Sequence, residues 1–232
     1  MAGPFRDYDA FAQAYAERTQ SNAYNAHYER PAIRALLGSI AGARVLDAGC
    51  AAGEHALWLV DRGATVTAID ISEAMLHLAR ARLDDRATVQ AADIGIPLPF
   101  ADATFDIVFS SLTLHYVADW TRTLAEFARV LVPGGTLVFS THHPALELGL
   151  DDYFTLREVD DRWDGFASEP VRVRFYHRPL QAIVAPLLTA GFCIEALVEP
   201  EPDAALAAID PTIDRLLRTK PFFLFVRARL AR

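Results

Sequence analysis

An aspartate followed by a glycine-rich turn is the first feature of this sequence that could bind a ligand. Asp47 ends the apolar run Arg44–Asp47, and Gly49 and Gly53 follow just before a helical stretch. Glycine lets the backbone pass close to a ligand, and the free N–H groups at a helix start favour a negatively charged group. The spacing differs from Gly-x-Gly-x-x-Gly and from the phosphate loop, and Lys220 is the only lysine. We therefore expect a nucleotide-type ligand that lacks a pyrophosphate.

Two further aspartates follow the next two strand-like runs. Asp70 ends Thr65–Asp70, 23 positions after Asp47, where an acid that accepts both ribose hydroxyls is expected. Asp93 follows Thr88–Ala92, and a carboxylate there can accept a hydrogen bond from an exocyclic amine such as that of adenine. Any one of these aspartates alone could be a helix cap or a solvated turn residue. Together they favour a ligand that contains a nucleoside.

Four motifs occur in order between Val45 and Ser140: Leu46-Asp-Ala-Gly-Cys-Ala-Ala-Gly53, Ala68-Ile-Asp-Ile-Ser-Glu-Ala-Met75, Leu98-Pro-Phe-Ala-Asp-Ala-Thr-Phe-Asp106 and Arg129-Val-Leu-Val-Pro-Gly-Gly-Thr-Leu137. With them this stretch resembles a known family, the class I S-adenosylmethionine-dependent methyltransferases, and within it the small-molecule type. The family usually has a glycine where Ala51 stands, so the turn is expected to sit slightly differently.

The resemblance implies S-adenosylmethionine as the cofactor and gives each residue of the site a role. A pocket lined with acids and free of lysine also suits a cationic sulfonium and an ammonium group. A nicotinamide dinucleotide would use the first two aspartates but leaves the third without a role. By the resemblance, Asp47 and the turn Gly49–Gly53 with Cys50 hold the methionine moiety, Asp70 holds the ribose, Ile71 and Met75 flank the adenine, Asp93 and the backbone of Ile94 bind its amine, and Ser110 lies beneath the sulfonium.

Three histidines are candidate bases for an acceptor that must lose a proton, because neutral imidazole suits this task near pH 7. They are His115, His143, which precedes Pro144 after the fifth predicted strand, and His177. Each could instead be a hydrogen-bonded packing residue. His142 and His143 are adjacent, so we expect them to point to opposite faces, with His143 toward the pocket. Neither stands at metal-ligand spacing from a cysteine, histidine or acid, and we expect no metal site.

Aromatic residues in two parts of the chain are candidate contacts for the acceptor. Tyr15 shares a helical face with Tyr8 and Phe11, and such a stripe is either core packing or, ahead of this fold, a lid. Residues 143–180 supply the largest group of aromatics, which suggests a flat or largely apolar acceptor, although some of them, such as Phe166, could form a small core of their own. The predicted acceptor contacts are Tyr15, Tyr24, His143, Trp163 and Tyr176.

The elements that must position these residues alternate short β-branched runs with helical stretches, a pattern typical of parallel sheets. We expect an α/β fold with a Rossmann-like, seven-stranded, mostly parallel sheet and helices on both faces. The predicted strands are Arg44–Asp47, Thr65–Asp70, Thr88–Ala92, Phe105–Ser110, Thr136–Ser140, Phe192–Val198 and Phe222–Arg229. The predicted helices of this part are Glu54–Arg62, Ser72–Leu83, Asp119–Leu131 and Leu180–Ala190.

Two stretches stand outside this alternation and suggest how the chain is divided. Residues 1–40 are helical in pattern and precede the first strand, which favours a lid. The stretch 143–180 is too long for a plain connection and indicates a small inserted cap. We expect an N-terminal helical lid over 1–40, a cofactor-binding core over 41–142, the inserted cap over 143–180 and the C-terminal part of the core sheet over 181–232.

Charge and composition narrow the class of partner. The 232 residues include 22 basic and 30 acidic side chains, a net charge of −8 at pH 7. This balance gives no general attraction for polyanions, so neither nucleic acid nor an anionic membrane is an expected partner. No apolar run approaches the ~18 to 20 residues of a membrane span, and two distant cysteines indicate a reduced compartment. We expect a cytoplasmic monomer or homodimer whose partner is a small-molecule acceptor.

These features together predict an enzyme that transfers a methyl group from S-adenosylmethionine to an O, N or C atom of a small organic acceptor by in-line displacement. One alternative is a methyltransferase that acts on a protein or RNA partner. Another is a protein that binds the cofactor without transferring the methyl group. Methylated product formed together with S-adenosylhomocysteine would distinguish transfer from binding alone.

Overall fold

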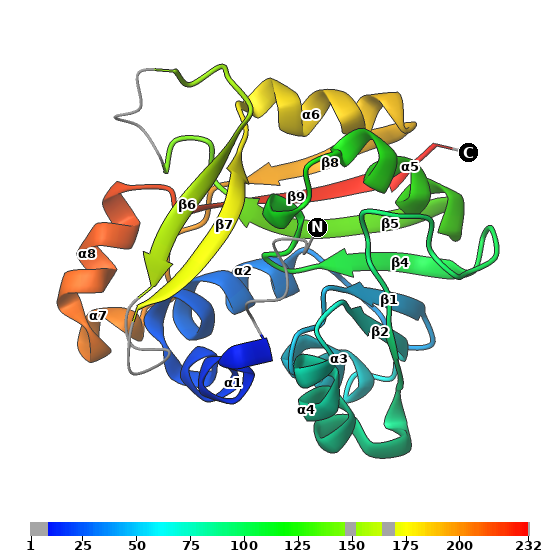
Figure 1. The fold of residues 1–232 in the computed structure, drawn as a ribbon, viewed down its shortest axis with the longest axis horizontal. Helices are drawn as coiled ribbons and strands as arrows, with labels where there is room; N and C mark the ends of the chain where they lie inside the picture. Colours follow the sequence, from blue (N-terminus) through cyan, green and yellow to red (C-terminus); the bar gives the residue numbers. More distant parts are fainter. Residues whose placement is uncertain (1–8, 147–151, 164–169, 232) are drawn as a thin grey trace.

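A seven-stranded sheet forms the centre of the computed structural model, which describes residues 9–146, 152–163 and 170–231 (Figure 1). The strand order is β3-β2-β1-β4-β5-β9-β8, and β9 runs antiparallel to both of its neighbours. This sheet confirms the predicted fold class. The strands are β1 Arg44–Ala48, β2 Thr65–Asp70, β3 Thr88–Ala91, β4 Phe105–Ser110, β5 Leu131–His142, β8 Phe192–Val198 and β9 Phe223–Leu230.

The direction in which the chain adds strands reverses between β1 and β4. Strands β2 and β3 extend the sheet on one side of β1, whereas β4 and β5 extend it on the other. In open parallel sheets, ligands bind outside the carboxyl ends of the strands at such a reversal. The fold therefore brings the residues that follow β1, β2 and β4 to one edge of the sheet, where a ligand can reach all of them.

Helices cover both faces of the sheet (Figure 1). Along β4, Ile107 and Phe109 belong to the core under α2, α3 and α4, while Val108 belongs to the core under α5 and α6. Strands buried on both faces in this way are typical of parallel sheets. Helices packed on both faces therefore keep the edge of the sheet in position. These helices are α2 Arg30–Ala35, α3 Glu54–Val60, α4 Glu73–Leu83, α5 Trp120–Val130 and α6 Leu180–Thr189.

The N-terminal part of the described chain is helical and packs beside α4. Helix α1, Ala12–Ser21, is followed by a π-helical turn, η2, Asn25–Glu29, which runs directly into α2. Asp9 ties the start of this segment to the N-terminus of α4, because its carboxylate accepts a hydrogen bond from the Ser72 hydroxyl. Ser72 in turn caps α4, as predicted, by accepting a backbone N–H of the first turn. The helical segment is thereby fixed next to the ligand edge of the sheet.

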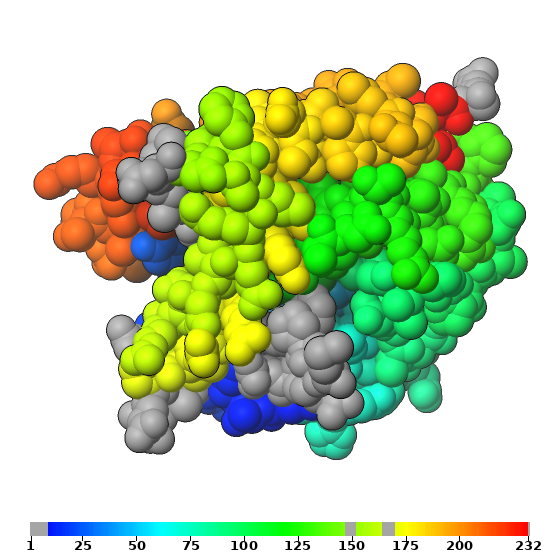
Figure 2. All heavy atoms as spheres, turned by 45° about the horizontal axis from the view of Figure 1, so that its top comes forward, coloured from blue at the N-terminus to red at the C-terminus, as the bar shows by residue number. Residues whose placement is uncertain are grey.

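The segment between β5 and α6 contains a β-hairpin made of β6, Arg157–Trp163, and β7, Val171–His177. Strand β7 alternates in burial: Val173 and Phe175 are buried, whereas Arg172 and Arg174 are exposed. Figure 2 shows the hairpin, in yellow-green and yellow, lying across the molecule from α6 toward α1. The hairpin therefore covers the end of the sheet at which β5 finishes.

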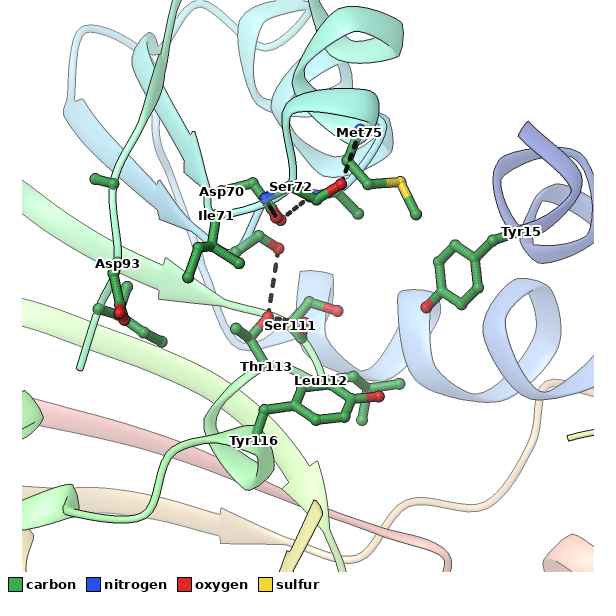
Figure 3. Close-up of a pocket in the computed structure, with 14 residues that line it drawn as sticks. Tyr15, Asp70, Ile71, Ser72, Met75, Asp93, Ser111, Leu112, Thr113 and Tyr116 are labelled. Atoms are coloured by element: carbon green, nitrogen blue, oxygen red, sulfur yellow. Dashed lines mark hydrogen bonds between the residues drawn. The ribbon is translucent and has the colours of Figure 1, made fainter. Parts of the chain in front are cut away.

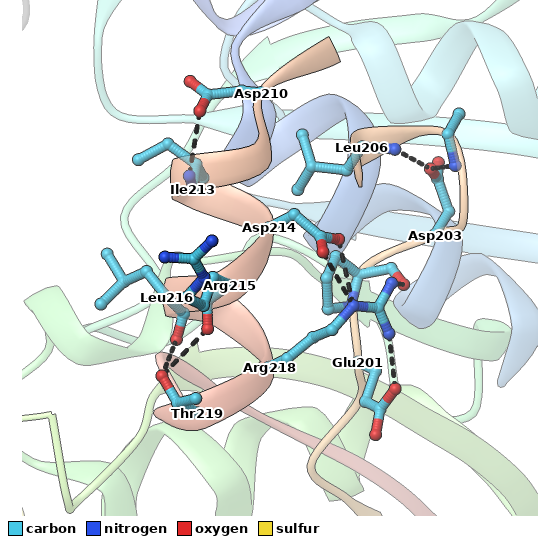
Figure 4. A network of polar contacts seen from close by, with 12 residues as sticks. Glu201, Asp203, Leu206, Asp210, Ile213, Asp214, Arg215, Leu216, Arg218 and Thr219 are labelled. Atoms are coloured by element: carbon cyan, nitrogen blue, oxygen red, sulfur yellow. Dashed lines mark hydrogen bonds and ion pairs between the residues drawn. The ribbon is translucent and has the colours of Figure 1, made fainter. Parts of the chain in front are cut away.

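Two short helices, α7 Leu206–Ile209 and α8 Pro211–Thr219, precede β9 and are not among the predicted elements. Asp210 caps α8 by accepting two backbone N–H groups, and Arg218 binds the carboxylate of Asp214 one turn earlier (Figure 4). An aspartate followed by proline is a known helix start signal. Within the described residues, every helix is too short or too polar to cross a membrane.

Candidate functional site

A cavity opens at the carboxyl ends of β1, β2 and β4 (Figure 3), and we call it the strand-end cavity. Tyr15 of α1 faces it from the side opposite Asp93, so the N-terminal helices complete its wall. The predicted cofactor residues that line the strand-end cavity are Gly49, Asp70, Ile71, Met75, Asp93 and Ile94.

The turn after β1 depends on glycine at one position above all. Gly49 has a φ of +87°, and a Cβ there would lie 2.2 Å from the Thr113 hydroxyl oxygen, far inside contact distance. Ala51 adopts the left-handed region with a φ of 46°, which costs an L-residue free energy. Its N–H donates a 2.9 Å hydrogen bond to Asp70 Oδ2. Asp70 thus holds Ala51 in a conformation that glycine adopts more readily.

The carboxylates of Asp70 and Asp93 are fixed at the ends of successive strands. Asp70 Oδ1 accepts the N–H of Ser72 at 3.0 Å, and burial is the main cause that raises the pKa of this carboxyl. Asp93 Oδ1 accepts the N–H of Gly95 at 2.7 Å. A carboxylate oxygen has more than one lone pair, so both groups keep acceptor capacity toward the strand-end cavity.

Asp47 lies in an adjoining pocket, the buried carboxylate pocket, together with Arg30, Cys50 and His55. Its side chain is 1% exposed, and Oδ2 has no hydrogen-bond partner among the described residues. Burial, followed by the charges of Asp70 and Glu29, raises the pKa of Asp47 to about 8, and burial also raises the pKa of the Cys50 thiol. A cationic group placed here would satisfy the carboxylate and favour its ionised form.

A second buried carboxylate, Glu29, connects the N-terminal helices to the sheet. Its Oε1 accepts hydrogen bonds from the hydroxyls of Ser111 at 2.6 Å and Ser140 at 2.7 Å, and its Oε2 lies 3.4 Å from His55 Nε2. Burial raises the pKa of Glu29, but the hydrogen bonds and the charge of His55 outweigh burial and hold the pKa below its usual value. The ends of β4 and β5 are thus tied to the π-helical turn η2.

A larger cavity of about 720 Å³, which we call the aromatic chamber, lies between the N-terminal helices, the β6–β7 hairpin and α8. It shares Tyr15, Leu112 and Tyr116 with the strand-end cavity. Its size is that of a site for a small organic ligand. The strand-end cavity and the aromatic chamber therefore meet at these three residues. Aromatic side chains on its walls include Tyr24, Trp163, Phe175, Phe222 and Phe223.

Two stacked histidines line the aromatic chamber. His115 belongs to the short 3-10 helix η4, Leu114–Tyr116, and His142 ends β5; their rings lie 3.8 Å apart with an interplanar angle of 12°. Burial is the main cause that lowers the pKa of both, to about 4 for His142. Both imidazoles are therefore neutral near pH 7, where each can accept a hydrogen bond at its unprotonated ring nitrogen.

Comparisons with known proteins agree with this geometry. Residues 46–139 match the methyltransferase domain family. The solved structure of an S-adenosylmethionine-dependent methyltransferase from Mesorhizobium loti is 33% identical, with a TM-score of 0.73 over 91% of this chain and 99% of that one. The chain belongs to the S-adenosylmethionine-dependent methyltransferases.

Two curated relatives carry more specific names. The methyltransferase is 32% identical over 204 residues to a malonyl-[acyl-carrier protein] O-methyltransferase of Enterobacter lignolyticus, which covers 87% of this chain and 77% of the relative. It is 36% identical over 163 residues to the protein of the same name from Serratia marcescens, over 69% of this chain but only 60% of the relative. The chain thus spans about three fifths of the Serratia protein.

The methyltransferase brings some of the predicted acceptor and catalytic residues together and separates others. Tyr15, Tyr24, Trp163 and His115 line the aromatic chamber. Three others, His143, His177 and Tyr176, instead line a small neighbouring cavity that shares His142 and Phe175 with the aromatic chamber. Tyr8 and Phe166 lie outside the described residues.

His143 and His177 of the small cavity already have partners. His143 Nε2 lies 2.7 Å from Glu199 Oε1, and its Nδ1 accepts the N–H of Ala145. His177 Nε2 donates to the carbonyl of Tyr153 at 2.9 Å. Both side chains thus have partners in the small cavity, and their expected role as bases stays a prediction.

Ser110 and Gly53, two further residues predicted at the cofactor, do not line the strand-end cavity. The Ser110 hydroxyl is buried and donates to the carbonyl of Ala48 at 2.8 Å, and it is the neighbouring Ser111 that lines the strand-end cavity. Gly53 precedes α3 with a φ of 79°, so it shapes the turn through its backbone. Ser110 therefore links the end of β4 to β1, and Gly53 shapes the turn before α3.

Proposed function

We propose that this methyltransferase holds S-adenosylmethionine in the strand-end cavity and transfers its methyl group to a small organic acceptor in the aromatic chamber. The observation that carries the proposal is that the two cavities meet at Tyr15, Leu112 and Tyr116. An in-line displacement needs the acceptor atom and the methyl group to approach along one line. Because the two cavities share these three residues, a cofactor in one and an acceptor in the other would be neighbours there.

The residues at the ends of β1, β2 and β3 fit the cofactor. The unpartnered Oδ2 of Asp47 suits the ammonium of the methionine moiety, and the fixed carboxylate of Asp70 suits the ribose hydroxyls. Asp93 suits the adenine amine, with Ile71 and Met75 as apolar neighbours of the ring. When bound, the cofactor supplies an electrophilic methyl group on a positively charged sulfur.

The chain itself contributes positioning and the exclusion of water. Tyr15 from α1 and Tyr116 from η4 form the wall between the two cavities, so the acceptor can be aligned there against the methyl group. Aromatic rings on the chamber walls offer apolar surface to a flat acceptor, which would displace water from the methyl group as it binds. Alignment and desolvation together can supply much of the acceleration of a methyl transfer.

A malonyl group on a carrier protein is a second candidate acceptor, because two relatives carry that name. The described lining of the aromatic chamber carries two arginines, Arg18 and Arg162, and two aspartates, Asp161 and Asp210. This balanced charge gives no net field for a carboxylate. A neutral small molecule is therefore the acceptor that the chamber favours.

Mass spectrometry of reactions with candidate acceptors tests the proposal. We expect a ring-containing small molecule to gain one methyl group while an equal amount of S-adenosylhomocysteine forms. Parallel reactions contain malonyl-loaded carrier protein. Methylation of the carrier-bound malonyl group with no turnover of any free small molecule would overturn the proposed acceptor class.

A further inference from the structure

The stacked pair His115 and His142 has unused hydrogen-bonding capacity. His115 is 2% exposed, and neither of its ring nitrogens has a hydrogen-bond partner among the described residues; the same is true of His142 Nδ1. Buried polar atoms without partners are rare in folded proteins and call for an explanation. Because both rings line the aromatic chamber, a ligand in that chamber is the partner they lack.

Neighbouring rings fix the pair without offering a proton partner. Phe175 of β7 presents its edge to both imidazoles, with a centroid distance of 4.5 Å to His142 and an interplanar angle of 83°. Phe223 of β9 lies nearly parallel to His142 on another side, at 6.1 Å. These ring contacts account for the orientation of the pair but supply no hydrogen-bond partner to its buried nitrogens.

No carboxylate pairs with either histidine in the described structure, so nothing holds the rings in the charged form. Arg178 lies close enough to lower the pKa of His115 further by its charge, and Tyr116 is in ring contact at 4.2 Å. The other ionisable groups that face the chamber are Tyr15, Arg18, Tyr24, Asp161, Arg162 and Asp210.

We propose that the His115–His142 pair accepts the proton of a hydroxyl group on a flat aromatic acceptor, so that the substrate class of the chamber is phenolic. The proposal rests on the proposed function and narrows its acceptor. A flat ring matches the aromatic walls, a neutral hydroxyl matches the balanced charge, and a donated proton matches the one ring nitrogen that is an acceptor in each neutral imidazole.

The step balances in atoms and charge. A lone pair of the hydroxyl oxygen forms the new bond to the methyl carbon, and the carbon–sulfur bond breaks with its electron pair left on sulfur. The electron pair of the O–H bond stays on oxygen, and the proton passes to a ring nitrogen of the pair, from which it later leaves to water. A hydroxyl oxygen that has gained a methyl group is so acidic that even an imidazole of lowered pKa takes the proton.

Binding of 7-hydroxycoumarin and 7-methoxycoumarin to the full chain, with S-adenosylhomocysteine present, tests the proposal without turnover. The two probes have the same ring system, but only the first can donate a hydrogen bond. We expect the hydroxyl compound to bind about 3- to 10-fold more tightly, which corresponds to one hydrogen bond. Coumarin fluorescence reports both affinities.

Variants identify the acceptor of that hydrogen bond. His115→Phe and His142→Phe keep a ring but remove the nitrogens, so each is expected to lower the preference for the hydroxyl compound toward 1 while the affinity for the methoxy compound stays within about twofold. His142→Asn, which keeps an acceptor oxygen, should retain part of the preference if a Phe variant does not fold. His77→Phe, at an exposed position of α4, is the matched control and should behave like the wild type.

Any one of three results would overturn the phenolic assignment. The wild type binds the two coumarins with equal affinity, it binds neither coumarin, or both Phe variants keep the wild-type preference for the hydroxyl compound. Calorimetry of S-adenosylhomocysteine binding to the same samples distinguishes a failure of the phenolic inference from a failure of the proposed function. If the cofactor product binds normally while the coumarins fail, the phenolic inference alone is lost. If the cofactor product itself does not bind to the wild type, the proposed function fails as well.

Discussion

Asp70 has a structural role and, under the proposed function, also a role in binding the cofactor. Its two oxygens accept the N–H groups of Ala51 and Ser72, which joins the turn after β1 to the start of α4. Hydrogen bonds to a charged acceptor contribute about 1.5–3 kcal/mol each. We expect Asp70→Ala to weaken binding of S-adenosylhomocysteine about tenfold to several hundredfold, as measured by calorimetry.

The matched control for this prediction is Asp85→Ala, at an exposed carboxylate of the short helix η3, Asp84–Arg86. It should bind the cofactor product as the wild type does. A folded Asp70→Ala protein with wild-type affinity would remove the ribose assignment.

Local rules explain which site residues the sequence could predict. Asp47 and Asp70 end parallel strands, and the carboxyl ends of parallel strands meet at one edge, so their proximity follows from the strand pattern alone. The choice between His142 and His143 depends on the register of β5 against β9, in which His142 pairs with Phe223. Residues 81 or more positions apart set that register, and no local pattern reveals it. The burial of Glu29 depends in the same way on two distant serines.

At the scale of elements, α1 forms part of the wall of both cavities through Tyr15. We expect S-adenosylhomocysteine to slow amide hydrogen exchange in residues 9–24, because a ligand in the strand-end cavity adds contacts to a helix whose outer face is exposed. Amides of α6, on the other face of the sheet, serve as the control and should exchange at an unchanged rate. Equal exchange of residues 9–24 with and without the ligand would mean that α1 is packing alone and does not act as a lid.

The β6–β7 hairpin supplies the chamber with Trp163 at its far end. Removing this half-buried ring is expected to reduce the affinity for 7-methoxycoumarin about fivefold, since it loses on the order of 1 kcal/mol of apolar contact. Binding of S-adenosylhomocysteine should not change. Phe154→Ala is the control, because Phe154 is 75% exposed and does not line the chamber. Identical coumarin affinities in Trp163→Ala and wild type would exclude the hairpin from the acceptor site.

The hairpin and α8 also show which secondary-structure elements can be predicted from the sequence and which cannot. The alternating residues of β7 follow a period of two that is visible in the sequence, and they indicate one strand. Its partner β6 is polar and mostly exposed, so nothing in its composition identifies a buried strand. Helix α8 begins with the pair Asp210–Pro211, a signal that is present in the sequence but lies outside the strand–helix alternation that organises the rest.

At the scale of the whole molecule, the raised pKa of Asp47 makes stability depend on pH. An unfolded aspartate ionises near its ordinary pKa, whereas the folded protein holds this proton up to a pKa of about 8. Between these values the native state binds more protons than the unfolded state, so the free energy of unfolding falls as pH rises. We expect Tm of the ligand-free protein to decline from pH 5 to pH 8 relative to Tm of Asp47→Asn, which carries no titrating group there. Thermal melts of Asp85→Asn should run parallel to the wild type; parallel profiles for Asp47→Asn as well would contradict the prediction.

The shared wall of Tyr15, Leu112 and Tyr116 also has a consequence for the order of events in a catalytic cycle. Whichever ligand binds first orders this wall, so the second ligand meets a surface that has already lost its conformational freedom. By thermodynamic reciprocity, saturation with either ligand must change the affinity for the other by the same factor. Under the proposed function, transfer removes the proton donor of the acceptor and the positive charge of the sulfur, so we expect both products to hold the wall less firmly than the substrates do. We therefore expect the two products to leave in succession, each departure promoting the next.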